Sequence, residues 1–126
     1  MVDERGGPEA DMAICCEAHS QGALITGNMA YYLPKEYTMK MNVRAVGPAS
    51  VISSRRFGSV VNYASSSDYI PYTDPWGYFS AWIRNDRNLM IYKSSNIFDH
   101  FLDHDCYIEA HQQIIRDFSL IRSRYE

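Results

Sequence analysis

The chain lacks several features that would place it in a familiar class. Its three cysteines, Cys15, Cys16 and Cys106, are an odd number with two of them adjacent, which argues against a secreted disulfide framework. The first residues, MVDERGGPEAD, are acidic and contain no apolar run of the kind found in a signal peptide. No apolar run approaches the roughly 20 residues of a membrane span. We therefore expect a protein that is not secreted by a signal peptide and has no membrane partner.

A strong excess of positive charge is also missing, since the net charge is −3. Residues 39–93 carry seven basic and three acidic side chains, whereas both flanking segments are acidic. A dedicated nucleic-acid-binding domain usually shows a stronger basic stripe. Arg55 and Arg56 have aromatic residues near them in sequence, and arginine with tyrosine or tryptophan can hold a single strand by charge and stacking. Weak contact of Arg55 and Arg56 with single-stranded DNA stays open, beside the alternative that they are solvated surface charges.

The first half of the chain predicts one helix and several strands. Residues 1–7 are polar and glycine-rich and are expected to be mobile, which leaves 8–126 as a single small domain or a fragment of a larger one. Pro8, Glu9 and Asp11 suit the first turn of a helix over about 8–20, closed by Gly22. Residues 39–45 alternate between apolar and polar side chains, which predicts a half-buried strand. Residues 50–53 and 57–63 predict two further short strands.

The second half predicts a hairpin and a long helix. Apolar runs at 78–83 and 89–93 flank the polar segment RNDRN, which is typical of an antiparallel hairpin. Ser95 or Asn96 would cap a helix that runs to about residue 118. Its apolar face is predicted to consist of four residues: Ile97, Phe101, Ile108 and Ile115. The expected fold class is therefore α+β, with a short N-terminal helix, several antiparallel strands and a long C-terminal amphipathic helix.

Three histidines of that expected helix, His100, His104 and His111, fall near one another on a helical wheel. A histidine pair spaced i, i+4 can bind zinc or another divalent metal, because both imidazoles project from one face. This spacing is the basis of a metal-dependent enzyme as one hypothesis. The alternative is that the three histidines are polar edge residues of an amphipathic helix, with no cofactor.

The segment YTDPWGYFSAWI, residues 72–83, concentrates aromatic side chains. One hypothesis is that Trp76, Tyr78 and Trp82 line an apolar ligand pocket or an interface, because aromatic-rich clefts are the usual small-ligand sites. The alternative is that these rings are core. No convincing catalytic constellation accompanies them, so the residues favour a structural or binding role over an enzyme.

The pattern Tyr-x-x-Pro-Trp-Gly-Tyr-Phe at 72–79 resembles a segment of capsid proteins of the parvovirus and densovirus family. Two further segments also resemble the family: VISSRRF at 51–57, before this pattern, and HQQIIRDFSLIRSR at 111–124, after it. The three segments stand in the same order as in the family. The resemblance is patchy. Ser80, Ala81 and Trp82 replace the family's Asp-Phe-Asn, and residues 1–49 match nothing in the family.

This resemblance implies a structural, non-catalytic assembly protein that forms part of a β jelly roll in a viral shell. It also implies self-association, weak contact with packaged single-stranded DNA, and a location in the virion or inside the host cell. A binding domain and a metal-dependent enzyme remain the alternative functions.

Overall fold

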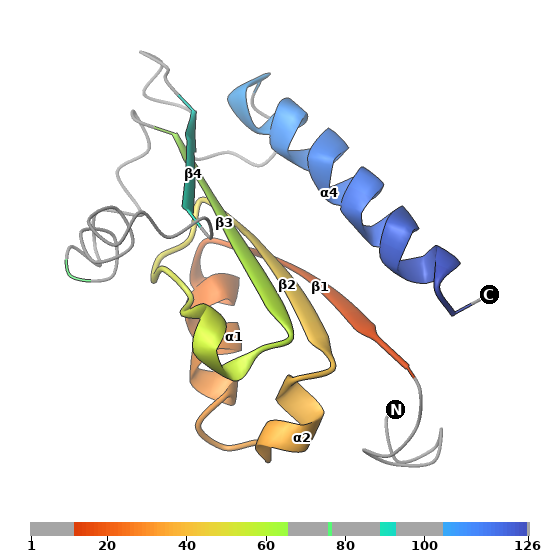
Figure 1. Cartoon of the computed structure of the whole chain (residues 1–126). Helices are drawn as coiled ribbons and strands as arrows, with labels where there is room; N and C mark the ends of the chain where they lie inside the picture. Colours follow the sequence, from red (N-terminus) through yellow and green to blue (C-terminus); the bar gives the residue numbers. More distant parts are fainter. Residues whose placement is uncertain (1–11, 66–75, 77–88, 93–104, 126) are drawn as a thin grey trace.

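The computed structural model describes residues 12–65, 76, 89–92 and 105–125 (Figure 1). Within these ranges the strands β1 (Ile14–His19), β2 (Met41–Val46), β3 (Ser59–Ser65) and β4 (Leu89–Tyr92) form one sheet in the order β1-β2-β3-β4. All three pairings are parallel. Because all four strands run in the same direction, their carboxyl ends lie at one edge of the sheet. Each pair of parallel neighbours is joined by a crossover connection.

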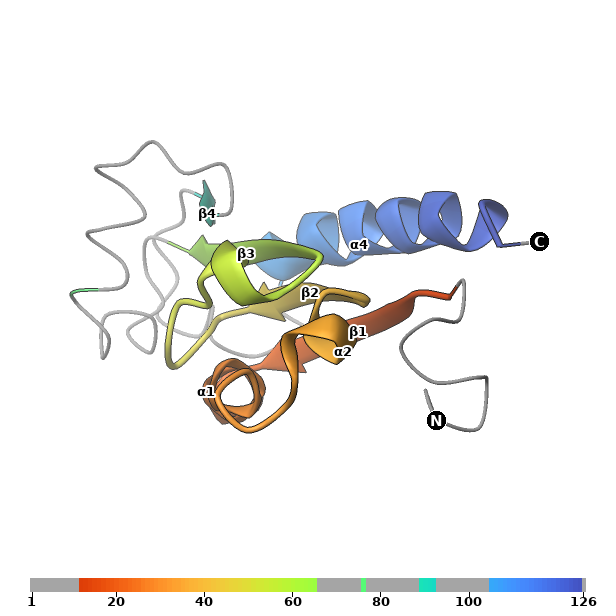
Figure 2. The ribbon, with the colours of Figure 1, turned by 60° about the horizontal axis from the view of Figure 1, so that its bottom comes forward.

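Helices cover both faces of this sheet. Between β1 and β2 the chain forms α1 (Gln21–Met29) and α2 (Lys35–Thr38), and between β2 and β3 it forms the short helix η3 (Ser54–Arg56). The long helix α4 (Asp105–Ser123) follows β4. Figure 2 shows α1 and α2 on one side of the sheet and α4 on the other. This is the α/β arrangement expected when crossovers return to a parallel sheet. None of the helices in the described ranges combines the length and apolar character needed to cross a membrane.

Alternation along the strands builds two separate cores. On the α1 side, Ala18 of β1, Val43 of β2 and Val60 of β3 pack with Ala23 of α1 and Phe57 of the η3 connection. On the α4 side the buried side chains are five: Val46, Tyr63, Tyr107, Ala110 and Ile114. Burial of apolar area on both faces supplies the main driving force for this layer structure.

The expected α+β class with antiparallel strands is wrong, because every strand pair in the sheet is parallel. A jelly roll is built from antiparallel strands, so the described sheet is not a part of one. The predicted hairpin is also corrected: β4 coincides with its second strand but pairs in parallel with β3. The first predicted strand, 78–83, lies outside the described residues.

The predicted N-terminal helix over 8–20 is wrong over its described part, because Ile14–His19 form β1 and the helix begins only at Gln21. Gly22 therefore stands in the first turn of α1 and does not end a helix. The predicted strand at 39–45 exists as β2, but it is buried on both faces. Arg44 on the supposedly solvated face is only 6% exposed. Residues 50–53, predicted as a strand, form a connection.

The apolar face predicted for the long helix does not face the sheet over its described part. Ile108 and Ile115 are 45% and 65% exposed, whereas Tyr107, Ala110 and Ile114 are buried against the sheet. Ile97 and Phe101 lie outside the described residues. The error has a physical cause. Polar residues of α4 are satisfied by polar partners on the sheet, so polarity on this helix does not mark the solvent side.

Candidate active site

Ser20 lies between the carboxyl end of β1 and the first residue of α1. In open parallel sheets this edge is where ligands bind, because the loops that leave the strands gather there. Ser20 is partly exposed. The residues that follow β2, beginning with Gly47, leave the sheet beside it at the same edge. The turn therefore presents a serine hydroxyl at the position where α/β proteins usually carry out their chemistry.

The backbone of Ser20 adopts a conformation that L-residues rarely occupy, with φ 56° and ψ −120°. Among the described residues it is the one non-glycine with a positive φ. Such strain costs of order 1–3 kcal/mol and persists only where the surroundings enforce it. Serine at the start of a helix usually caps it through its hydroxyl, but the Ser20 side chain makes no capping bond to α1. The Ser20 hydroxyl therefore does not serve as the cap of α1.

Two connections of the sheet enforce this conformation. The Ser20 N–H donates to the carbonyl oxygen of Val46 at 3.3 Å, and the Ser20 carbonyl accepts from the N–H of Ala49 at 3.0 Å. The same carbonyl also accepts from the N–H of Ala23 in the first turn of α1 at 3.1 Å. Both backbone groups of Ser20 are thus tied to β2, its following loop and α1. The turn is a fixed part of the sheet edge.

The start of α1 offers an anion-stabilising group next to the hydroxyl. Gln21 is the first residue of α1, and the first N–H groups of a helix have no acceptor within the helix. The helix dipole places partial positive charge at the same end. A backbone N–H directly after a reactive serine is the group that stabilises the oxyanion of acyl transfer in the strand–turn–helix arrangement. The arrangement of Ser20 directly before the Gln21 N–H is of the kind that suits a nucleophile and one oxyanion donor.

Small residues stand two positions before and after the serine. The turn reads Ala18-His19-Ser20-Gln21-Gly22, a variant of the Gly-x-Ser-x-Gly pattern with alanine in place of the first glycine. Ala18 is buried against α1, where a larger side chain would push helix and strand apart. A side chain added at Gly22 would meet no described atom within 4 Å. The close packing that the pattern usually requires is therefore present at Ala18 but not shown at Gly22.

The nearby cysteines are poor competitors for a nucleophilic role. Burial raises the pKa of the Cys15 thiol above its ordinary value, and the positive charge of Arg44 offsets part of this rise. Burial also raises the pKa of Cys16; the negative charge of Glu17 adds to the effect and a hydrogen bond with Thr26 opposes it. With raised pKa values, both thiols stay largely protonated at neutral pH. Because the thiolate is the reactive form, both are weak nucleophiles.

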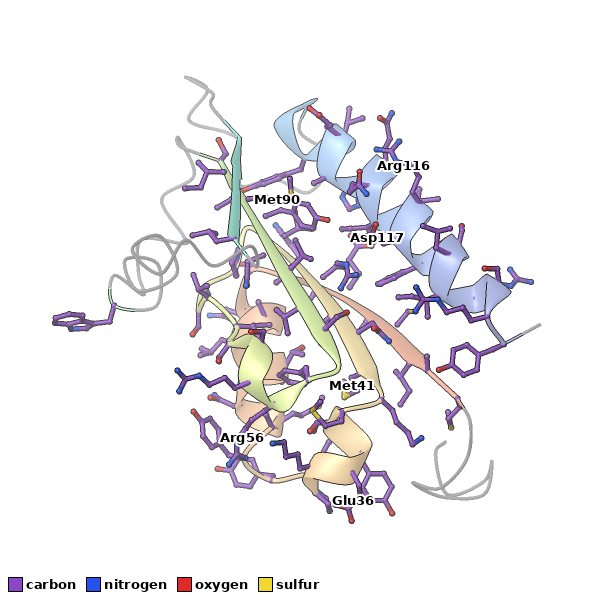
Figure 3. All side chains as sticks on the ribbon, in the orientation of Figure 1. Glu36, Met41, Arg56, Met90, Arg116 and Asp117 are labelled. Atoms are coloured by element: carbon purple, nitrogen blue, oxygen red, sulfur yellow. The ribbon has the colours of Figure 1, made fainter. Side chains whose placement is uncertain are left out.

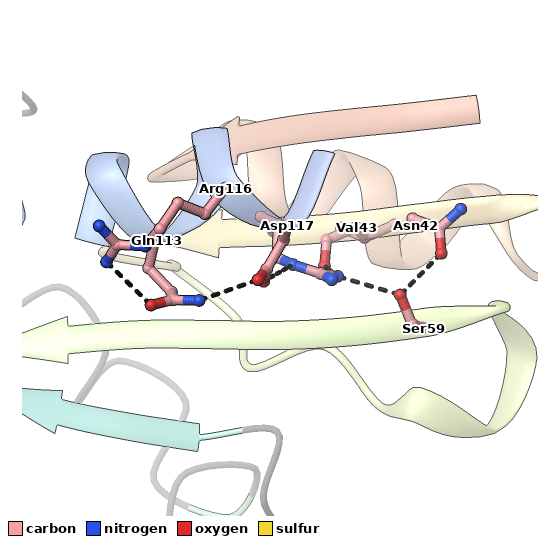
Figure 4. A network of polar contacts seen from close by, with 7 residues as sticks. Asn42, Val43, Ser59, Gln113, Arg116 and Asp117 are labelled. Carbon is pink, nitrogen blue, oxygen red and sulfur yellow. Dashed lines mark hydrogen bonds and ion pairs between the residues drawn. The ribbon is translucent and has the colours of Figure 1, made fainter. Parts of the chain in front are cut away.

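A polar network joins α4 to the face of the sheet that lies opposite α1 (Figure 4). Arg44 Nε lies 3.1 Å from Asp117 Oδ2, and Gln113 Nε2 donates to the other oxygen of Asp117 at 2.9 Å. The Arg44 guanidinium also donates to Ser59 Oγ at 3.0 Å and lies over the ring of Phe118. Figure 3 places Asp117 between α4 and the strands. This network fixes the helix that follows β4.

The residues predicted from the sequence as sites lie mostly away from Ser20 or outside the described part. His111 on α4 pairs with Glu17 of β1, with 2.9 Å between Nδ1 and Oε1. His100 and His104 lie outside the described residues, so the metal site stays a prediction. The described residues contain no cluster of three or more metal-ligating side chains.

The aromatic and basic candidates are partly placed. Trp76 is 78% exposed, and Tyr78 and Trp82 lie outside the described residues. Arg56 on η3 donates to the carbonyl of Ala30 at 2.6 Å and lies over the ring of Tyr31. Figure 3 shows Arg56 beside α1, on the other side of the sheet from α4. Arg55 is exposed on η3.

Sequence reasoning missed Ser20. The available signal was a short stretch, residues 14–18, that is apolar except for Glu17 and is followed by x-Ser-x-Gly and then by helix-forming residues. Reading residues 8–20 as one helix concealed it, because the pattern has meaning only between a strand and a helix.

Comparison of the chain with protein-family models, with curated proteins and with solved structures gives no match.

Strain at Ser20 predicts an unusual order of stabilities among its variants. Glycine adopts a positive φ without penalty, whereas alanine keeps the Cβ that causes the strain. We expect Ser20→Gly to be more stable than Ser20→Ala by about 1–2 kcal/mol in urea unfolding. Equal stabilities, or a more stable alanine variant, would show that Ser20 is unstrained.

Proposed function

We propose that the chain carries the nucleophilic serine of a hydrolase that acts on acyl compounds such as carboxylic esters. The observation that carries the proposal is the strained conformation of Ser20 between a parallel strand and a helix. α/β-hydrolases present their serine on such a turn, at the carboxyl edge of the sheet. The order β1-β2-β3-β4, with helices on both faces, supports the same arrangement.

The residues at the turn account for two parts of the reaction. Ser20 Oγ attacks the carbonyl carbon of the ester, and its proton passes to a general base. The tetrahedral intermediate places negative charge on the former carbonyl oxygen, where the Gln21 N–H and the positive end of α1 stabilise it. Departure of the alcohol, which takes up the proton, leaves an acyl-serine. Attack by water on this ester then releases the acid and restores Ser20.

The order of residues along the chain suggests where the base comes from. In α/β-hydrolases the triad follows the order Ser, Asp or Glu, His. Here Asp68 and Asp74 follow β3, and His100 and His104 follow β4. The chain leaves β3 and β4 from the same edge that carries Ser20, because the strands are parallel. These four residues lie outside the described part, and only their order in the sequence bears on the proposal.

Alanine variants of the histidines test the proposal through hydrolysis of p-nitrophenyl acetate. We expect His100→Ala or His104→Ala to lower kcat by about 10²–10⁴-fold, the usual contribution of a general base. His111→Ala is the matched control, because His111 contacts Glu17 on the α4 side, and its activity should stay within about threefold of the wild type. Unchanged activity in both the His100 and His104 variants, or no hydrolysis by the intact wild-type protein, would contradict the proposal.

The capsid function implied by residues 72–79 stays a second, untested proposal, as do self-association and contact with single-stranded DNA. Its jelly-roll component does not apply to the described sheet. The ester-hydrolase proposal is preferred because it accounts for the conformation of Ser20, whereas a shell protein gives no reason for a strained serine at this edge.

A further inference from the structure

A pocket of about 150 Å³ lies beside α1, between this helix and the connection from β2 to β3. Its lining includes three residues from the α1 side and three from the connection: Leu24, Gly27 and Tyr31, and Ile52, Arg56 and Phe57. Ile52 and Phe57 are only 3% and 2% exposed and form a buried apolar floor. Leu24 and Tyr31 are open to solvent at the walls.

The pocket is linked to Ser20 through one of its walls. On α1, Leu24 and Gly27 are three residues apart, a spacing that places both on one helix face. On the other wall, Ala49 bonds the Ser20 carbonyl, and the next residues, Ser50 to Ile52, line the pocket. The segment from Ala49 to Ile52 therefore runs from a backbone contact with Ser20 to the lining of the pocket.

The floor of the pocket is held rigid. The side chain of Asn62, fully buried in β3, accepts from the Ile52 N–H and donates to the Ile52 carbonyl, both at 3.0 Å. At the far end, Arg56 reaches across from η3 to the carbonyl of Ala30 and covers the ring of Tyr31. These contacts give the pocket a fixed depth, with a cationic group where it ends. Preformed apolar pockets with a few polar groups are typical ligand sites.

We infer that this pocket binds the acyl chain of the substrate and limits its length. The inference rests on the proposed nucleophile Ser20. A cavity of about 150 Å³ holds a group the size of benzene, so the pocket accommodates an acyl chain of roughly six carbon atoms. The occupant is a short, unbranched acyl group whose carbonyl carbon lies at Ser20 and whose tail lies over Ile52 and Phe57. Longer chains meet Arg56 and Tyr31.

Gly27 offers a way to fill the pocket. A Cβ at this position would lie 3.7 Å from Ile52 Cγ1, an ordinary contact, so Gly27→Ala should fold normally and leave most of the space open. The larger side chain of Gly27→Leu would occupy it. With p-nitrophenyl esters of increasing chain length, we expect the wild type to prefer butyrate and hexanoate over decanoate by about tenfold or more in kcat/KM. Gly27→Leu should lose about tenfold on hexanoate and keep its activity on acetate.

Arg56→Ala removes the far wall and should extend the preference toward decanoate. Ile25→Ala, a change at an exposed residue of α1 outside the pocket lining, should keep the wild-type profile. Methyl NMR of Ile52 during titration with sodium hexanoate gives a second readout that needs no catalysis, and its shift should disappear in Gly27→Leu. An unchanged chain-length profile in Gly27→Leu together with no hexanoate-dependent shift of Ile52 overturns the pocket while leaving Ser20 intact. A hexanoate shift without ester hydrolysis supports the pocket and contradicts the proposed function.

Discussion

Ester hydrolysis should fall by at least about 10³-fold in kcat when Ser20 is replaced by alanine. The alanine variant keeps the backbone contacts to Val46, Ala49 and Ala23, because these involve only main-chain atoms. It also keeps the Gln21 N–H at the start of α1. The loss would therefore report on the hydroxyl alone, since the oxyanion donor and the fold stay in place.

A matched control for this prediction is Ser123→Ala. Ser123 is exposed at the end of α4, and its hydroxyl donates to the carbonyl of Leu120 at 2.7 Å. We expect its activity to equal that of the wild type. Ser20→Cys gives a further comparison, because a thiol at the same turn can still attack and form an acyl intermediate. A Ser20→Ala variant that keeps more than about a tenth of the wild-type kcat would contradict the assignment of the nucleophile.

Replacing Asp117 with alanine should lower the free energy of unfolding by about 3 kcal/mol. Removal of one partner from a buried ion pair typically costs 3–5 kcal/mol, because the remaining charge is left without compensation. The Arg44 side chain is 7% exposed and Asp117 is 23% exposed. Arg44 keeps its bonds to Ser59 Oγ and to the carbonyl of Val43, which places the expected loss at the lower end of that range.

The pair formed by Glu17 and His111 is the matched control for urea unfolding. Its side chains are 35% and 27% exposed, and partly exposed pairs contribute about 0–1 kcal/mol. Glu17→Gln should therefore change stability by less than about 1 kcal/mol. A double variant, Arg44→Met with Asp117→Leu, should recover much of the loss, because well-packed apolar residues often replace a buried pair without penalty. A loss below about 1 kcal/mol in Asp117→Ala would show that the network does not hold α4.

Local patterns predicted β2 and the long C-terminal helix, but they did not predict the environment of either element. Alternation at 39–45 identified a strand because the side-chain period is two, whatever lies on the second face. The same alternation predicts that Asn42 and Arg44 face solvent, yet α4 supplies Asp117 to Arg44 from 73 residues away in the sequence. A partner at that separation leaves no local trace, so both the double burial and the orientation of α4 were missed.

The direction of strand pairing was missed for a related reason. A short apolar run fits either an antiparallel hairpin or a buried parallel strand, and the choice depends on which strand it meets. Leu89–Tyr92 pair with β3, which lies 24 residues earlier in the chain. The site itself was within reach, because x-Ser-x-Gly follows directly on Ile14–Ala18. It stayed hidden because Pro8, Glu9 and Asp11 resemble a helix start, which extended a predicted helix through the strand.

Both the proposed ester hydrolysis and the proposed acyl pocket require Ser20 to be a reactive nucleophile. Labelling of the intact protein with a fluorophosphonate, followed by tryptic digestion and mass spectrometry, tests this most directly. Tryptic cleavage after Arg5 and Lys35 yields the peptide 6–35, in which Ser20 is the sole serine. We predict that this peptide carries the phosphonate adduct in the native wild-type protein, and that the adduct is absent from Ser20→Ala and from heat-denatured protein. An unlabelled 6–35 peptide in the native protein, or equal labelling of Ser20→Ala, would contradict the account.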